Sequence, residues 1–339
     1  MRRPLKLTLA LTWRCHHRCG ICAIWSREKG REMTVNQLDR LFASVPRLTW
    51  LDLTGGEVVA REDLADIAAV LHRRLPRLAL LHFPTAGMRP EATERAARAM
   101  VRPGGPRVIV TVSLDGPQAV HDRLRGMPGA FERALETWQR LDAVPGLAVY
   151  AGMTLQPGNL DQVDATVAAI AQARPGFSHA DLHVNFLHRS GHYFGNEAVA
   201  GCAPEAVARA LADLRLRKGV ARGPVAAIEA AYLKLVPQNL ATGRSPLPCR
   251  SGELSAYVAP DGTVYACTID GRPAGRLEDF AWDLGALWEG DARRALRTEV
   301  AADRCAGCWT PCEAYQTLLT QPVALARALR QPERQAGNS

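Results

Sequence analysis

The segment Thr12–Cys22 reads TWRCHHRCGIC, and its chemistry decides how the rest of the chain is interpreted. Cys15, Cys19 and Cys22 are spaced CxxxCxxC, so one short loop presents three thiolates. Thiolates favour iron-sulfur clusters, zinc or Cu(I), but structural zinc sites and ordinary ferredoxin clusters use four ligands. Three ligands would leave one iron of a cluster open to a small molecule. The simpler alternative is a zinc knuckle or a chance group of thiols.

Strand and helix patterns alternate on both sides of this loop. Leu5 to Thr12 alternates with period two and predicts a strand that ends at the loop, and Thr34 to Gln37 forms a capping box at the start of a helix. Six such units predict a parallel α/β structure, an incomplete (βα)6 barrel of the TIM type, with its site at the carboxyl ends of the strands. The predicted strands are 5–12, 50–54, 78–83, 107–114, 147–155 and 180–187.

The pattern changes after the sixth strand and predicts a second, small α+β unit. Helices are expected at 204–218 and 224–236, followed by a linker rich in Pro, Gly and Ser. The turn Pro260-Asp261-Gly262 separates two strand-like runs and predicts a hairpin. The expected boundaries are a barrel at 1–203, a helical linker at 204–246, a cysteine-rich domain at 247–315 and a C-terminal tail at 316–339.

Composition narrows the class of protein. The chain has 339 residues, 47% of them hydrophobic and 22% charged, which is ordinary for a globular protein. Neither a signal peptide nor an apolar run of about 20 residues is found, so we expect a soluble, cytoplasmic protein without a membrane span. The net charge of +8 is spread along the chain and does not predict nucleic-acid binding. Eight of the nine cysteines are clustered, which indicates metal ligands rather than disulfides.

The three-cysteine loop after an N-terminal strand resembles that of the radical S-adenosylmethionine (SAM) superfamily. The resemblance implies that Cys15, Cys19 and Cys22 hold a catalytic 4Fe-4S cluster, whose open iron binds SAM and whose electron cleaves it to a 5'-deoxyadenosyl radical. Gly55-Gly56-Glu57 matches the superfamily's GGE motif, which holds the methionine amino group. Val58 replaces the usual Pro of that motif, which should alter only the rigidity of the turn.

The same resemblance implies further SAM contacts at the end of the fourth strand. Ser113 and Asp115 occupy the matching positions, and Arg125 follows in the segment HDRLR. The alternative for Arg125 is an ordinary solvated side chain. Thr85-Ala86-Gly87 lacks the Asn that is common in the family's third-strand motif, so it is not included among the expected site residues.

The C-terminal cysteines resemble a SPASM or twitch domain that binds auxiliary clusters. Cys249 is followed by twelve residues, Gly262, four residues and Cys267, and the second half of the pattern has Cys305, Cys308 and Cys312. A full SPASM domain uses seven cysteines for two clusters, so five imply one auxiliary 4Fe-4S cluster. The favoured ligands are Cys249, Cys267, Cys305 and Cys308, with Cys312 spare or exchanged with Cys308. A zinc site is the alternative.

Polar residues near the end of the sixth strand are candidates for substrate contacts, although each His could equally be a satisfied structural group. Cys202 is the one thiol outside the two clusters, and a free Cys is usually a small buried hydrophobe. The substrate candidates are His183, Asn185, His188, His192 and Tyr193.

The favoured function is a radical SAM enzyme that oxidises or remodels an unactivated C-H bond, with the auxiliary cluster as electron relay and a flavodoxin or ferredoxin as electron donor. Because the first strand starts by Leu5, no N-terminal leader-binding domain is expected, which favours a small molecule or lipid as substrate. One alternative is an enzyme that crosslinks or epimerises ribosomal peptides, with Cys202 as hydrogen donor. Another is an electron-transfer iron-sulfur protein without a substrate.

Overall fold

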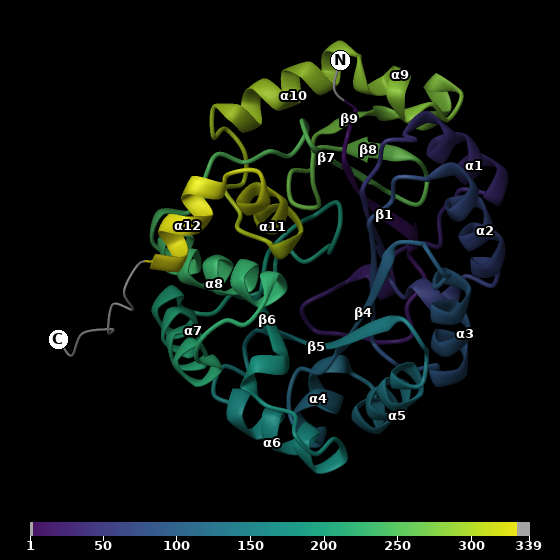
Figure 1. The fold of residues 1–339 in the computed structure, drawn as a ribbon. Coiled ribbons are helices and arrows are strands. Elements are labelled where there is room, and N and C mark those ends of the chain that lie inside the picture. Colours follow the sequence, from purple (N-terminus) through teal and green to yellow (C-terminus); the bar gives the residue numbers. More distant parts are fainter. Residues whose placement is uncertain (1–2, 331–339) are drawn as a thin grey trace.

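Six parallel strands form the main part of the sheet in the computed structural model, which describes residues 3–330. Each strand pairs with the next one along the chain, and the helices lie outside them (Figure 1). The incomplete (βα)6 barrel predicted from the sequence is therefore confirmed. The strands are β1 (Lys6–Thr12), β2 (Trp50–Gly55), β3 (Leu80–Thr85), β4 (Arg107–Ser113), β5 (Leu147–Leu155) and β6 (Leu182–Phe186).

Amphipathic helices cover the outer face of these strands. The capping box predicted at the first helix is present, since the Thr34 backbone N-H donates to Gln37 Oε1 at 2.8 Å and the Gln37 N-H donates to Thr34 Oγ1 at 3.3 Å. The short helix after β4 was not predicted. The helices are α1 (Val35–Ser44), α2 (Leu64–Arg74), α3 (Pro90–Met100), α4 (Gln118–Arg125), α5 (Ala130–Asp142) and α6 (Val163–Ala173).

The C-terminal domain continues the barrel's sheet instead of standing apart from it. β7 (Ser255–Val258) pairs in parallel with β1, so that Lys6 lies opposite Ser255. The predicted hairpin follows, with β8 (Thr263–Tyr265) antiparallel to β7, and an unpredicted strand, β9 (Pro273–Arg276), completes it. The resulting nine-stranded sheet has the order β6-β5-β4-β3-β2-β1-β7-β8-β9. β1 is therefore buried between the two cysteine-bearing regions.

The helices after β6 differ in detail from the prediction. α7 (Pro204–Lys218) has the expected bounds, but α8 (Pro224–Thr242) runs six residues beyond 236 and contains Pro237. Two further helices, α9 (Leu284–Trp288) and α10 (Asp291–Ala301), follow β9. Residues 316–330, expected in a tail, form the end of α11 (Pro311–Leu319) and α12 (Pro322–Arg330), which lie beside α8 (Figure 1). The tail expected after Gln331 lies outside the described residues.

The two faces of β1 are both buried but differ in chemistry. Leu7, Leu9 and Leu11 are at most 1% exposed and belong to the main hydrophobic core. Lys6 and Thr8 alternate with them and are only 2% exposed. A polar residue on a doubly buried strand needs a partner inside the protein, so the inner face of the barrel is where the site should be sought. Among residues 3–330, no helix is long and apolar enough to cross a membrane.

Candidate cluster and substrate site

The three-cysteine loop rests directly on the Gly55-Gly56-Glu57 turn. The N-H groups of Gly56 and Glu57 donate to the carbonyl oxygens of Thr12 and Arg14, both at 2.8 Å. Gly55 has φ +125°, and a Cβ on either glycine would collide with one of these two oxygens. The pair of glycines is therefore required because the backbone of β2 must approach the backbone that carries the cysteines.

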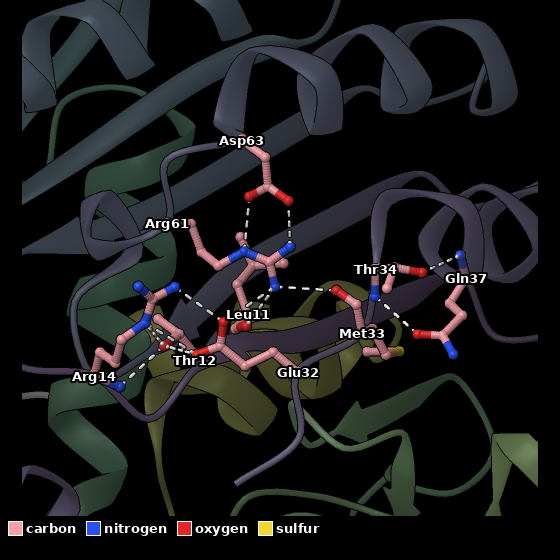
Figure 2. A network of polar contacts seen from close by, with 9 residues as sticks. All are labelled: Leu11, Thr12, Arg14, Glu32, Met33, Thr34, Gln37, Arg61 and Asp63. Carbon is pink, nitrogen blue, oxygen red and sulfur yellow. Dashed lines mark hydrogen bonds and ion pairs between the residues drawn. The ribbon is translucent and has the colours of Figure 1, made fainter. Parts of the chain in front are cut away.

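A buried arginine that the sequence analysis missed ties the start of the loop to its surroundings (Figure 2). Arg61 Nη1 donates to the carbonyl oxygens of Met33 at 3.0 Å and Leu11 at 3.2 Å, and Arg61 Nη2 lies 2.6 Å from Asp63 Oδ2. Glu32 Oε1 accepts a hydrogen bond from the Thr12 hydroxyl, and Glu32 Oε2 lies 3.6 Å from Arg61 Nη1. Arg61 lies four residues after Glu57, and its contacts with the loop become visible only in the folded chain.

The other side of the loop contacts the segment after β4. The Arg18 N-H donates to the Arg125 carbonyl oxygen at 2.9 Å, and Arg125 Nη1 lies 4.0 Å from Cys19 Sγ. Arg125 Nη2 lies 2.7 Å from Asp115 Oδ2, whose other oxygen accepts from the Thr154 N-H at 2.9 Å. Arg125 is thus a buried cation beside the cysteines and not a solvated side chain. Ser113 is half-buried at the end of β4.

The electrostatics of the loop fit a metal cluster. Burial raises the pKa of Cys15 to about 12 and that of Cys22 to about 11, so the thiols would be protonated without a metal to replace their protons. His17 is 1% exposed, and neither of its ring nitrogens nor Arg125 Nε has a hydrogen-bond partner among residues 3–330. Three thiols beside a buried guanidinium are a suitable donor set for an anionic iron-sulfur cluster with an open iron.

Glu57 lies deeper than the motif alone suggested. It is 2% exposed and accepts from Thr85 Oγ1 at 3.1 Å and from the Ala86 N-H at 2.8 Å. Burial raises its pKa, although these two donors act against the shift. The sequence analysis had left Thr85-Ala86-Gly87 out of the site, and the structure brings this segment into contact with Glu57.

Four of the five C-terminal cysteines lie close enough for their charges to interact. Burial is the main cause of the raised pKa values of Cys249 and Cys267. The thiol of Cys305 adds to the shift at Cys249, and the thiol of Cys308 adds to the shift at Cys267. Cys267 Sγ also accepts from the N-H groups of Ile269 at 3.4 Å and Asp270 at 3.3 Å, a pattern that stabilises a thiolate. Among residues 3–330, no three His, Cys, Asp or Glu side chains are close enough together to hold a single metal ion.

The Cys305–Cys308 turn is positioned by α8. Asn239 Nδ2 donates to the carbonyl oxygens of Gly307 at 2.7 Å and Arg244 at 2.8 Å. Gly307 has φ +64°, and a Cβ there would collide with the carbonyl oxygen of Gly243. Residues 238–242 were expected in a linker, so the sequence gave no reason to select Asn239.

The fifth C-terminal cysteine, Cys312, lies near charged residues of the barrel strands. Burial raises its pKa to about 11, and the nearest charges that act on it belong to Lys6, Asp52 and Glu313. Lys6 Nζ donates to the Cys312 carbonyl oxygen. Cys312 therefore lies beside β1 and β2, and Glu313 acts both on it and on the thiols of Cys249, Cys267 and Cys308.

A cavity of about 220 Å³ is lined by Cys22 of the first group and by Cys312 of the C-terminal domain. Three of the five expected substrate residues, Asn185, His188 and Tyr193, also line it. The other walls come from the inner faces of the barrel strands and from the C-terminal domain. They include Thr8, Asp52, Thr54, His82, Pro84, Thr154, Thr268 and Thr310.

The remaining two histidines do not line this cavity. His183 Nδ1 lies 3.1 Å from Glu229 Oε2 on α8. The ring of His192 bridges Ser190 Oγ at 3.0 Å and the Cys267 carbonyl oxygen at 3.1 Å, so it joins the barrel to the C-terminal domain. A contact of these two histidines with substrate therefore stays a prediction, because both rings are engaged with other parts of the protein.

Cys202 does not line the cavity either. It packs as a partly buried side chain against the main hydrophobic core, in agreement with the simpler interpretation of a free cysteine.

The sequence analysis also missed the charged groups at the cavity. Lys6 Nζ lies 3.0 Å from Asp52 Oδ2, and His82 links Asp52 Oδ1 at 3.2 Å to Thr111 Oγ1 at 3.0 Å.

Comparison with known proteins finds two matching families. Residues 10–170 match the radical SAM superfamily, and residues 249–309 match the SPASM iron-sulfur cluster-binding domain. The sporulation killing factor maturation protein SkfB of Bacillus subtilis is 24% identical over 317 residues, 89% of this chain and 68% of that protein. The AdoMet-dependent heme synthase of Methanosarcina barkeri is 33% identical over 137 residues, 39% of this chain and 37% of that protein.

Solved structures support the fold over nearly the whole chain. The structure of anSMEcpe with bound AdoMet has a TM-score of 0.63 at 13% identity, and the alignment covers 97% of this chain and all of that one. Streptococcus suis SuiB bound to S-adenosylmethionine has a TM-score of 0.61 at 13% identity, over 87% of this chain and 68% of that one. The domain that carries the second group of cysteines is therefore placed as in proteins of known structure.

Proposed function

Because the chain belongs to the radical SAM superfamily and carries a SPASM iron-sulfur cluster-binding domain, we propose that it modifies a residue of a ribosomally made peptide. Its cofactors are SAM and two iron-sulfur clusters. The first cluster, when bound, supplies the electron that cleaves SAM and starts radical chemistry at a C-H bond. The remaining question is which molecule carries that bond.

The similarity to SkfB supports a peptide substrate, because it extends over 89% of this chain and that protein matures a sporulation killing factor. In the structures of similar fold, SuiB is bound to the precursor peptide SuiA and anSMEcpe to the Cp18Cys peptide. The similarity to the heme synthase covers only 39% of this chain. The small molecule or lipid favoured by the sequence analysis was inferred from the start of the chain, and the shorter heme synthase match supports it less than the SkfB match supports a peptide.

In this proposal each of the two groups of cysteines holds one of the two clusters. Cys15, Cys19 and Cys22 are the ligands of the SAM-binding cluster, and the buried guanidinium of Arg125 offsets part of its negative charge. The backbone at Gly55 and Gly56, together with Glu57 and Ser113, surrounds SAM. Asp115 orients Arg125 and so acts indirectly.

The auxiliary cluster is held by the four C-terminal cysteines whose charges interact. These ligands are Cys249, Cys267, Cys305 and Cys308.

The cavity fits one residue of a substrate. Its volume of about 220 Å³ is below the range of roughly 300 to 1,000 Å³ that is usual for pockets that enclose a drug-sized ligand. Asn185, His188 and Tyr193 provide hydrogen-bonding groups in it, and Tyr193 is oriented by a 2.6 Å hydrogen bond between its hydroxyl and Thr54 Oγ1. A single side chain of a longer peptide would enter the cavity while the rest of the peptide stays outside.

A competition between substrate classes tests the proposal. The reconstituted protein is given SAM, dithionite and either short peptides encoded beside its gene or cyclitol-type alcohols. We expect a peptide to accelerate formation of 5'-deoxyadenosine and to change in mass, because hydrogen abstraction is coupled to the correct substrate. Acceleration by an alcohol, without an effect of any peptide, would contradict the proposal and favour the small-molecule alternative.

A further inference from the structure

Cys312 has no function in the site as described so far, yet it lies in its centre. It lines the same cavity as Cys22, from the opposite domain. The cavity is also lined by the hydroxyl-bearing residues Thr8 and Thr310, which are 2% and 4% exposed and whose hydroxyls have no hydrogen-bond partner among residues 3–330. Two unpartnered buried hydroxyls beside a thiol indicate that this end of the cavity receives a ligand.

The surroundings of Cys312 also contain a source of protons. Lys6 Nζ donates to the Cys312 carbonyl oxygen and lies 3.0 Å from Asp52 Oδ2. Asp52 in turn contacts His82, which also lines the cavity. An ammonium group is thus held beside Cys312 by a buried ion pair, within reach of a polar chain that extends across the barrel.

We propose that the Cys312 thiol donates a hydrogen atom to a carbon-centred radical formed in this cavity. This inference rests on the proposed function, because radical chemistry must first generate that radical. The S-H bond of Cys312 breaks homolytically and a C-H bond forms on the ligand, which leaves a thiyl radical on the sulfur. One electron from the low-potential reductant that drives the enzyme, together with a proton from the Lys6 ammonium, restores the thiol.

Chemistry favours a thiol for this step. An S-H bond is weaker than most C-H bonds, so transfer of its hydrogen atom to a carbon radical is favourable, whereas the O-H bond of a serine is too strong. Burial keeps the sulfur of Cys312 protonated at neutral pH, since its pKa is raised to about 11. Return of a hydrogen atom leaves the oxidation level of the substrate unchanged. The predicted outcome is therefore inversion at carbon, with Cys312 replacing Cys202 as the donor.

The experiment needs no peptide, so its result is independent of the test of substrate class. The reconstituted protein is incubated with SAM and dithionite in deuterated water, and the deuterium in 5'-deoxyadenosine is measured by mass spectrometry. The thiol exchanges its proton with solvent, so the wild type should yield deuterated 5'-deoxyadenosine. Cys312→Ser and Cys312→Ala should lose most of this deuterium, whereas Cys202→Ser, a matched thiol outside the cavity, should retain it.

Iron analysis separates the donor from a cluster ligand. If Cys312 is a donor, both variants keep about eight irons per chain, as expected for two 4Fe-4S clusters. A fall to about four would identify Cys312 as a ligand of the auxiliary cluster and overturn the inference. Wild type that yields no deuterated 5'-deoxyadenosine would also overturn it, whether or not the variants fold, and so would equal deuterium in wild type and Cys312→Ser.

Discussion

The buried pair of Lys6 and Asp52 offers the sharpest test of how the two domains are joined. Lys6 is 2% exposed, and its ammonium contacts Asp52 in the barrel and the Cys312 carbonyl oxygen in the C-terminal domain. Asp52→Asn keeps the size of the side chain but removes its charge. The ammonium of Lys6 would then lose its ion-pair partner, and Glu313 would be the acidic side chain that still acts on it.

The expected cost follows from this burial. Removing one partner of a buried ion pair costs about 3 to 5 kcal/mol. The lower end applies here, because the amide oxygen of Asn can still accept from Lys6. With an unfolding entropy of about 2.1 cal/mol/K for each of the 339 residues, 1 kcal/mol shifts the melting temperature by about 1.4 °C, so that of the reconstituted protein should fall by about 4 °C. Thermal unfolding is followed by circular dichroism under anaerobic conditions, at equal iron content.

Two controls make the result interpretable. Asp291→Asn removes a carboxylate that is 96% exposed, so it should leave the melting temperature nearly unchanged. Lys6→Met combined with Asp52→Asn should recover part of the loss, because no unpaired charge remains buried. A double variant that is no more stable than Asp52→Asn, or a single variant as stable as Asp291→Asn, would refute the reasoning.

The effect should also depend on pH. Burial alone would raise the pKa of Asp52, but Lys6 and His82 bring it well below its usual range. A carboxyl with a lowered folded-state pKa contributes stability above its unfolded pKa of about 4, and loses it as the pH falls through the folded value. The difference between wild type and Asp52→Asn should therefore be constant near neutral pH and shrink in acid.

Replacing Cys249 and Cys267 together with alanine should lower the iron content from about eight to about four per chain, because one 4Fe-4S cluster loses two ligands. Unchanged iron would contradict an auxiliary cluster at these residues. Replacing all three cysteines of the 15–22 loop with alanine should abolish the formation of 5'-deoxyadenosine, measured by chromatography, and persistent cleavage of SAM in that variant would remove the proposed mechanism. Arg61→Met should destabilise the protein by about 2 kcal/mol, because it leaves buried backbone oxygens and Asp63 without their donor. The same variant should slow SAM cleavage, and a variant with wild-type melting and cleavage would show that the network in Figure 2 does not position the loop.

Local sequence determined the elements and both groups of cysteines. Apolar periodicity and the capping box at Thr34 need only a few neighbouring residues, so β1 to β6 and most outer helices could be predicted. The cysteines could be selected because their spacing is a property of the chain itself. His183 and His192 were chosen by closeness to a strand end alone, and the sequence could not show that their side chains contact Glu229 and the Cys267 carbonyl oxygen.

Tertiary structure alone decided which residues meet inside the barrel. The pairing of β7 with β1 brings Cys312 to the Lys6 ammonium, although 306 residues separate them in the chain. Nothing near Lys6 in the sequence indicates a partner, because an isolated lysine in a strand usually faces solvent. The sequence thus determined which chemistry the chain carries, and long-range strand pairing determined which thiol faces the cavity.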